Sequence, residues 1–277
     1  MYIIDGNKIK EEKTIEISKK VASINDKLKL VVIQVGNDPA SSVYVKNKRI
    51  FCERVGILFE HVKYDSINQN DLISKIKDLN NDNSVTGILV QLPLPENIDK
   101  NEIVSAIDPL KDVDGLTPTN IGNLFLGRTS LIPCTAIGVL ELLNSINANI
   151  EGSNIVIVGD SILVGLPLLA LLIQKGATVT ICNENTKDLK NKTKEADILI
   201  VAIGAKEFIK EDYIKEGSIV IDVGINREFN KLYGDCDFEN MKEKCKAITP
   251  VPGGVGPLTV TMLINNVTQA YYMQKKD

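Results

Sequence analysis

Continuous apolar runs, separated by helical patterns, constrain the fold of this chain most strongly. Residues 30–33, 87–90 and 155–158 are uninterrupted apolar runs. Such runs are typical of strands that a parallel sheet buries on both faces. Helical periodicity lies between them, for example over about Lys8–Ile24 and Gln69–Leu79. The alternation predicts a layered α/β fold.

The alternation forms two series. In the first we expect a helix that Ser41 or Ser42 caps, running to about Arg54, and the strands Leu28–Val35, Ile57–Val62 and Gly87–Val90. The second series follows a helix over Ile137–Ile146 and ends in a helix over Leu258–Met273. Its expected strands, with helical segments between them, are Asn154–Val158, Ala177–Cys182, Ile198–Ala202 and Ser218–Val223. This spacing suits a nucleotide-binding parallel sheet.

Composition narrows the class of protein. The 277 residues suit two modest domains, and 44% hydrophobic with 25% charged residues is ordinary globular composition. The net charge of −4 without a basic block argues against a nucleic-acid partner. Five cysteines, none in a Cys-x-x-Cys pair, predict neither a metal site nor a disulfide framework. We expect no signal peptide and no membrane span, and hence a cytoplasmic protein.

One loop has the features of a phosphate-binding turn. The strand at 155–158 runs into Gly159, Asp160 and Ser161, and Gly165 with Pro167 then opens a helix. Glycines allow a sharp turn and a close approach, while the free N–H groups of a helix start attract a pyrophosphate. The spacing differs from G-x-G-x-x-G, so a plain glycine turn is the alternative.

The next predicted strand ends at Cys182-Asn183-Glu184. In a dinucleotide-binding sheet, an acid at this position binds the ribose 2′-hydroxyl of NAD, whereas a basic residue accommodates the 2′-phosphate of NADP. Glu184 beside Asp160 would repel that phosphate. The alternative is that Glu184 only faces solvent.

The first series carries a set of polar residues that could orient a flat heteroaromatic ligand. Tyr44 and Lys48 share one face of a predicted helix, although such a pair can also be a surface contact. Gln91 follows a strand, where open α/β sheets bind ligands, and Asp114 lies in a turn. A partly desolvated lysine has a lowered pKa and can move protons.

These residues carry a resemblance. The stretches that carry it are Val35-Gly36-Asn37-Asp38-Pro39-Ala40-Ser41-Ser42-Val43-Tyr44-Val45-x-x-Lys48, Gln91-Leu92-Pro93-Leu94-Pro95, Lys111-Asp112-Val113-Asp114-Gly115, Pro133-Cys134-Thr135 and Pro250-Val251-Pro252-Gly253-Gly254-Val255-Gly256-Pro257-Leu258-Thr259. They resemble the bifunctional methylenetetrahydrofolate dehydrogenase/methenyltetrahydrofolate cyclohydrolase family, in family order and over nearly the whole chain.

The resemblance implies two α/β domains with a cleft between them, the second a Rossmann-type parallel-sheet dinucleotide-binding domain. The expected folate-binding catalytic domain is 1–135, with the C-terminal helix 256–277 packing back on it, and the NAD(P)-binding domain is 136–255. It also implies a cytoplasmic homodimer that acts on tetrahydrofolate derivatives, with no metal.

The implied activity has two steps, which belong to one-carbon metabolism and supply purine biosynthesis. An oxidoreductase step passes a hydride from 5,10-methylenetetrahydrofolate to NADP, and a hydrolase step opens the methenyl product to 10-formyltetrahydrofolate. The implied catalytic residues are Lys48, Tyr44, Gln91 and Asp114. The implied folate pocket adds Val90, Leu92, Pro252, Gly253, Gly254, Val255 and Gly256. The implied dinucleotide contacts are Gly159, Asp160, Ser161 and Ile225, and the phosphate loop and the following strand end add Gly165, Glu184 and Thr186 as expected contacts.

The chain departs from the family pattern at the dinucleotide site. Relatives often have Gly-Arg-Ser at the phosphate loop and His-Ser-Arg/Lys-Thr at the following strand end. Here these stretches read Gly159-Asp160-Ser161 and Asn183-Glu184-Asn185-Thr186. Both changes add acid, so NAD stays open beside NADP, although Lys187 could reach a phosphate. Ala136 replaces a usual proline.

Two other functions compete with this interpretation. The first is another Rossmann enzyme, such as an amino-acid or shikimate-type dehydrogenase, which has no reason to carry the set formed by Tyr44, Lys48, Gln91 and Asp114. The second is a non-catalytic folate or nucleotide binder, which would show ligand protection against unfolding but no turnover.

Overall fold

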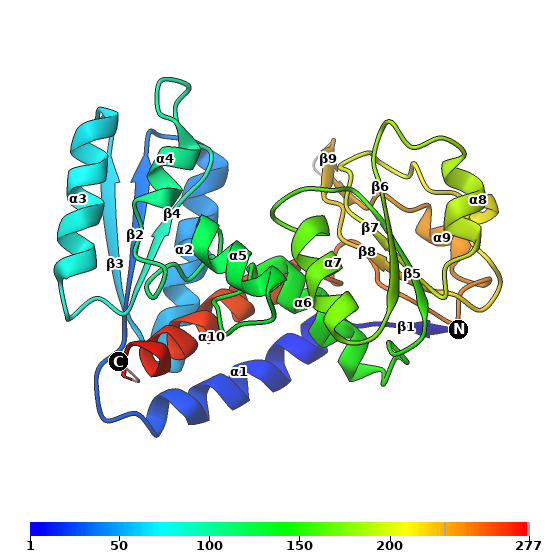
Figure 1. Ribbon diagram of the computed structural model, residues 1–277, viewed down its shortest axis with the longest axis horizontal. Coiled ribbons are helices and arrows are strands. Elements are labelled where there is room, and N and C mark those ends of the chain that lie inside the picture. Colours follow the sequence, from blue (N-terminus) through cyan, green and yellow to red (C-terminus); the bar gives the residue numbers. More distant parts are fainter. Residues whose placement is uncertain (230, 276–277) are drawn as a thin grey trace. The chain divides into compact units, whose positions relative to one another are not determined.

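The computed structural model describes residues 1–229 and 231–275, and the chain divides into two compact units (Figure 1). The six-stranded unit comprises Met1–Glu11 and Pro133–Thr259, and the three-stranded unit comprises Glu12–Ile132 and the chain from Val260 onward. Two helices, α1 (Gly6–Ala22) and α10 (Gly256–Gln274), continue from one unit into the other. The mixed α/β architecture agrees with the predicted fold class.

The three-stranded unit is built around a parallel sheet with the strand order β3-β2-β4. Its strands are β2 (Lys29–Val35), β3 (Leu58–Tyr64) and β4 (Gly87–Val90), and its other helices are α2 (Pro39–Val55), α3 (Gln69–Asn81), α4 (Lys100–Ser105) and α5 (Pro118–Phe125). Residues 30–33 of the central strand β2 are fully buried, as the apolar run predicts. Leu72 and Ile76 of α3 share one core cluster with Val31 and Ile33 of β2.

Polar side chains of α10 fasten this helix to the three-stranded unit. The Asn266 amide donates hydrogen bonds to the carbonyl oxygens of Val113 and Ile132, at 2.9 and 2.8 Å. Gln274 donates to the carbonyl oxygens of Thr86 and Leu110. Most of α10 therefore packs in the three-stranded unit, although the rest of that unit, Glu12–Ile132, lies more than a hundred positions earlier in the chain.

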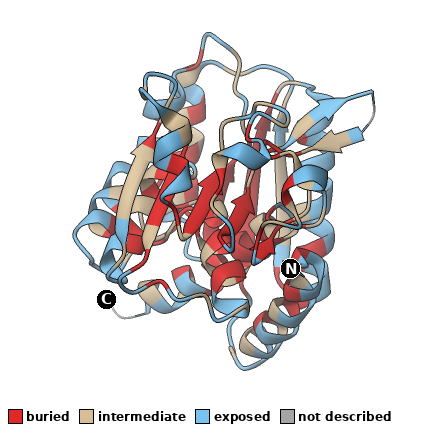
Figure 2. Ribbon diagram, turned by 90° about the vertical axis from the view of Figure 1, so that its right-hand side faces the viewer, coloured by how far each residue is buried: buried red, intermediate tan, exposed pale blue. Residues whose placement is uncertain are grey.

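The six-stranded unit is a parallel sheet with the order β1-β11-β8-β7-β5-β6. Its strands are β1 (Tyr2–Ile3), β5 (Asn154–Val158), β6 (Thr178–Cys182), β7 (Ile198–Val201), β8 (Ile219–Asp222) and β11 (Ala247–Ile248), and its helices are α6 (Cys134–Ser145), α7 (Gly165–Gln174), α8 (Leu189–Lys194) and α9 (Phe238–Met241). Figure 2 shows buried residues concentrated in the strands. The chain reverses direction across the sheet between β5 and β7, which is where such sheets bind ligands.

The N-terminal segment differs from the predicted domain boundaries. Residues 1–135 were expected to form one domain, but Met1–Glu11 belongs to the six-stranded unit. The reason is strand pairing, because Tyr2 and Ile3 pair with Ala247 and Ile248 at the edge of the six-stranded sheet. A strand of two residues carries too little periodicity to reveal such a pairing.

Two local predictions were wrong. The cap of α2 is Asp38, whose side chain accepts a hydrogen bond from the Ser41 backbone N–H at 2.6 Å, so neither serine caps this helix. Between β7 and β8 the described residues hold no α-helix, only the 3₁₀ turn η1 (Glu211–Tyr213). Backbone pairing of residues 207 and 209 with residues 234–236 occupies that segment instead, next to a hairpin of β9 (Asn226–Glu228) and β10 (Lys231–Tyr233).

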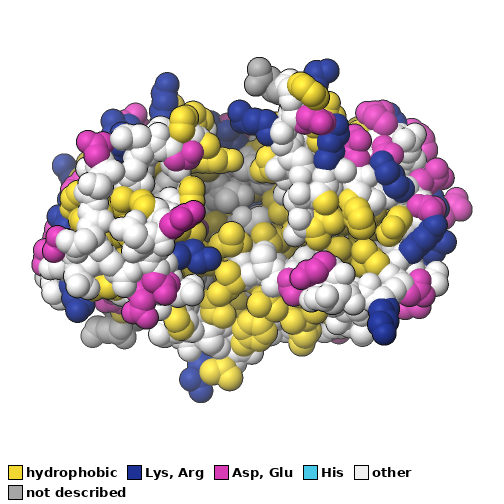
Figure 3. Space-filling model, turned by 90° about the horizontal axis from the view of Figure 1, so that it is seen from above, with side chains coloured by type: hydrophobic (Ala, Val, Ile, Leu, Met, Phe, Trp, Pro, Cys, Tyr) yellow, Lys and Arg dark blue, Asp and Glu magenta, His cyan; other side chains and the backbone are white. Residues whose placement is uncertain are grey.

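The surface carries charges of both signs. On the face in Figure 3, basic and acidic side chains are interspersed, and neither sign forms a continuous patch there. Within the described ranges, no helix combines the length and the apolar character that crossing a bilayer requires.

Candidate active site

Lys48 and Gln91 meet at the carboxyl edge of the three-stranded sheet. The Lys48 Nζ donates a hydrogen bond to the Gln91 Oε1 at 2.6 Å. The Gln91 Nε2 donates to the carbonyl oxygen of Leu92 at 2.7 Å, and its backbone N–H donates to Ile33 of β2. Because the amide nitrogen is engaged with Leu92, the amide oxygen is directed to the lysine.

Three other residues expected at the folate site lie on α2, at the end of β4, or just after it. Tyr44 lies one turn before Lys48 on α2 and is 49% exposed, so its phenol is accessible to a ligand. Val90 is the last residue of β4 and is buried, whereas Leu92 is half-buried. The Leu92–Pro93 peptide is cis, and it follows Gln91 directly.

A buried carboxylate holds the turn that carries Asp114. Asp112 accepts hydrogen bonds from the backbone N–H groups of Gly115 and Thr117, at 3.0 and 2.7 Å, and from the Asn120 amide at 3.0 Å. Asp112 is 1% exposed. Sequence reasoning missed this support, although an aspartate three residues before a glycine in a turn is a recognisable signal.

Lys111, next to Asp112, is a second buried support that the sequence analysis missed. Its Nζ donates to the carbonyl oxygens of Leu79 and Asp82, at 3.1 and 2.8 Å. Burial lowers the pKa of this ammonium, and nearby Asp108 opposes that effect. Asp114 is half-buried within the turn that these contacts fix.

A pocket of about 530 Å³ opens at the carboxyl edge of the six-stranded sheet. Its lining includes five residues that the sequence analysis named for dinucleotide binding: Gly159, Asp160, Ser161, Glu184 and Thr186. The opposite part of the lining includes Ala202, Ile203, Ala205 and Phe208, which the sequence analysis missed. These residues follow β7, whose end gave no polar signal to identify them.

Gly165 supports the pocket rather than lining it. A Cβ at this residue would lie 1.9 Å from the Gly159 carbonyl oxygen, and a Cβ at Gly159, where φ is 115°, would lie 2.2 Å from the Ala202 carbonyl oxygen. Only glycine permits these approaches. The start of α7 is therefore held against the turn, and the positive end of its helix dipole follows the loop directly.

The polar side chains that line the pocket are acids, an amide and hydroxyls. The Asn183 Nδ2 donates to the Asp160 Oδ2 at 3.0 Å, and the Thr186 hydroxyl accepts from the Asn183 backbone N–H at 2.9 Å. Asp160 and Glu184 are exposed. No lysine or arginine is among the described lining residues. Across residues 1–229 and 231–275, no three His, Cys, Asp or Glu side chains could together hold a metal ion.

The glycine-rich loop at Pro252–Gly256 belongs to the six-stranded unit. Gly253 has a φ of 109°, and its carbonyl oxygen accepts a hydrogen bond from the Gly6 N–H at 2.8 Å. A Cβ at Gly256 would lie 3.7 Å from Ile225 Cδ1. Ile225, which was expected to contact the dinucleotide, thus lies beside this loop and is 52% exposed.

Comparisons with known proteins identify the family of the chain. The family model for the catalytic domain of tetrahydrofolate dehydrogenase/cyclohydrolase matches residues 4–114, and the model for its NAD(P)-binding domain matches residues 133–275. The chain is 47% identical over 273 residues to the bifunctional protein FolD of Agathobacter rectalis, covering 97% of this chain and 98% of that protein.

Solved structures agree in fold and sequence. The bifunctional FolD enzyme of Campylobacter jejuni has a TM-score of 0.95 and 44% identity, covering 99% of each chain. The Trypanosoma brucei enzyme, solved with NADP cofactor and an inhibitor, has a TM-score of 0.94 and 33% identity, covering 100% of this chain and 99% of that one. These matches exclude the competing Rossmann dehydrogenases and the non-catalytic binder. The chain belongs to the tetrahydrofolate dehydrogenase/cyclohydrolase family, and it is a bifunctional methylenetetrahydrofolate dehydrogenase and methenyltetrahydrofolate cyclohydrolase.

Proposed function

We propose that Lys48 moves the proton in the cyclohydrolase step and that Gln91 sets its protonation. Water adds to the methenyl carbon and loses one proton, which leaves a neutral hydroxyl adduct. The ring C–N bond then breaks as its nitrogen gains a proton, while the hydroxyl gives up its own proton to become the formyl carbonyl. The products are 10-formyltetrahydrofolate and one released proton. The 2.6 Å contact between Lys48 and Gln91 is the observation that carries this proposal.

The neutrality of Gln91 supports this role. A carboxylate at this distance would hold the lysine as an ammonium, whereas an amide oxygen accepts a hydrogen bond from either protonation state. The Leu92 contact keeps the amide from rotating and presenting its nitrogen to Lys48. Lys48 can therefore exchange a proton without losing its orientation.

The proposal also covers the other folate contacts. Tyr44 offers an accessible ring for stacking, and Asp114 offers a carboxylate to the pterin from a turn that Asp112 holds. Val90, Leu92 and the loop from Pro252 to Gly256 would supply apolar and backbone contacts.

The pocket beside Gly159 would hold the dinucleotide, with the pyrophosphate near Gly159 and Ser161 and the adenine ribose near Glu184 and Thr186. A coenzyme held there would supply the hydride acceptor, and the protein would align the two reactants. NADP is the proposed coenzyme, as in the trypanosomal complex. NAD is the second candidate, because Asp160 and Glu184 add negative charge where a 2′-phosphate would lie.

Two experiments test these assignments. Lys48→Met should abolish cyclohydrolase turnover, measured from methenyl absorbance, while the variant still oxidises methylenetetrahydrofolate, which serves as its folding control. Full cyclohydrolase activity would refute the role of Lys48. Separately, initial rates with NADP and with NAD identify the coenzyme, and Asp160→Arg should shift the ratio of the two kcat/KM values toward NADP.

A cytoplasmic homodimer is also proposed. All five cysteines are free and buried, which suits a reducing compartment. The edge strand β3 leaves Leu58 49% exposed, and an unpaired edge of this kind can pair with a second copy. Sedimentation of the purified protein measures the oligomeric state directly.

A further inference from the structure

We propose that the buried carboxylate of Asp235 is a positioning residue that sets the backbone of Ile203–Ala205 at the dinucleotide pocket. Its Oδ2 accepts hydrogen bonds from the N–H groups of Ile203 and Gly204, at 2.7 and 3.0 Å. Its Oδ1 accepts from the Ala205 N–H at 2.9 Å. Asp235 is completely buried. One side chain thus engages three successive peptide groups just after β7.

A second buried carboxylate fixes Asp235 in turn. Asp222, at the end of β8, accepts hydrogen bonds from the backbone N–H groups of Gly224 and Asp235, both at 3.0 Å, and of Cys236 at 2.8 Å. Asn226 donates its Nδ2 to the Asp235 Oδ1 at 2.8 Å. Both the backbone and the carboxylate of Asp235 are therefore held, so the positions of its oxygens are defined.

Two glycines make room for this pair of carboxylates. A Cβ at Gly224 would lie 2.2 Å from the Asp235 Cγ, and a Cβ at Gly234 would lie 1.9 Å from an Asp222 oxygen. The carboxylates cannot move outward without displacing backbone. Because Asp235 is held by this close packing, its hydrogen bonds hold the backbone of the loop after β7 in one position.

The loop that Asp235 holds forms one wall of the pocket. Ile203 and Ala205 line it, and the Ala205 carbonyl oxygen accepts the Phe208 N–H, so a third lining residue depends on the same turn. Burying two carboxylates costs free energy unless each is fully hydrogen-bonded. Apolar side chains would fill this volume at a lower cost in free energy. The carboxylate of Asp235, in contrast, also fixes three peptide N–H groups beside the pocket proposed for the dinucleotide.

The inference rests on the proposed placement of the dinucleotide in this pocket. Asp235→Asn preserves shape but replaces one acceptor oxygen with an NH₂ group, which must face an N–H donor. We expect the Kd for NAD(P)H, measured by its fluorescence, and the dehydrogenase KM for the oxidised coenzyme to rise about 10- to 100-fold. Cyclohydrolase kcat/KM, which needs no dinucleotide, should stay at the wild-type value.

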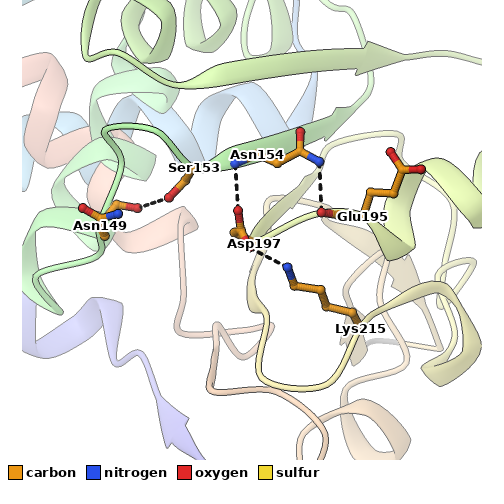
Figure 4. A network of polar contacts seen from close by, with 6 residues as sticks. All are labelled: Asn149, Ser153, Asn154, Glu195, Asp197 and Lys215. Atoms are coloured by element: carbon orange, nitrogen blue, oxygen red, sulfur yellow. Dashed lines mark hydrogen bonds and ion pairs between the residues drawn. The ribbon is translucent and has the colours of Figure 1, made fainter.

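Asp197→Asn is the matched control. Asp197 precedes the opposite end of β7, where it accepts the Asn154 N–H at 2.8 Å and the Lys215 ammonium at 2.5 Å (Figure 4). This variant also removes a charged acceptor of a backbone N–H on the same sheet, but away from the pocket. It should lower the melting temperature and leave the Kd unchanged. An Asp235→Asn variant that changes the Kd no more than Asp197→Asn does would overturn the inference.

Two further variants separate the remaining outcomes. If Asp235→Asn does not fold, Asn226→Ala removes one donor to Asp235 and should raise the same Kd about three- to tenfold; an unchanged Kd would count against the positioning role. If Asp160→Arg alters dinucleotide binding and the Asp235 and Asn226 variants do not, the positioning role fails while the placement stands. If none of these variants alters it, the placement itself is wrong.

Discussion

Gln91→Glu tests the proton-transfer proposal most directly. The substitution keeps the size of the side chain and places a carboxylate oxygen 2.6 Å from the Lys48 Nζ, at a residue that is 9% exposed. An opposite charge this close, with little solvent screening, raises a lysine pKa by about 1–3 units. In the wild-type protein the Leu92 carbonyl oxygen accepts a hydrogen bond from the Gln91 Nε2. In the variant a carboxylate oxygen takes the place of that nitrogen and faces the same carbonyl oxygen.

The expected magnitude follows from the fraction of neutral amine. Raising the lysine pKa by about 1–3 units lowers that fraction about 10- to 1000-fold at neutral pH, and the cyclohydrolase rate should fall with it. The rising limb of the pH–rate profile should move upward by the same number of units, so that activity recovers at high pH. A purely structural defect would lower the rate equally at every pH.

The assay is methenyl hydrolysis followed by absorbance across the pH range, with dehydrogenase turnover as the folding control. Gln34→Glu is a matched variant, because it places a carboxylate at another buried glutamine, on β2 of the same sheet, that hydrogen-bonds His61 and Ser42 instead of Lys48. It should leave the profile in place. A Gln91→Glu enzyme with the wild-type rate and profile would refute the reasoning.

Two further predictions concern the six-stranded unit. Gly165→Ala places a Cβ 1.9 Å from the Gly159 carbonyl oxygen, so it should lower the free energy of unfolding by about 1–3 kcal/mol. The variant should also bind the dinucleotide more weakly while its cyclohydrolase activity persists. An NAD(P)H affinity equal to that of the wild type would contradict this prediction. Burial raises the pKa of Asp222 from 3.8 to about 6, so the folded state binds more protons between these values. The free energy of unfolding should therefore fall by about 3 kcal/mol as pH rises from about 4 to about 6. Urea unfolding checks this, and an equal slope in Asp222→Asn would assign the effect to another group.

Local patterns in the sequence were sufficient for most of the fold and for part of the site. The apolar run at 30–33 predicted a central buried strand, because a strand covered on both faces has no polar positions. The glycines at 159 and 165 predicted a tight strand-to-helix turn, since no other residue tolerates that approach. Lys48 and Gln91 were chosen from their positions on a helix and after a strand, and the structure brings them into contact.

Tertiary structure decided what depends on distant partners. Tyr2 and Ile3 form an edge strand only because Ala247 and Ile248 lie beside them, and a two-residue strand has no periodicity of its own. The sequence analysis did not single out Asp235. It is completely buried, because it accepts hydrogen bonds from the N–H groups of residues 203–205, which lie far from it in the sequence. A charged side chain can be buried only where the fold places hydrogen-bond partners around it. Those partners come from distant parts of the chain, so the local sequence does not show them.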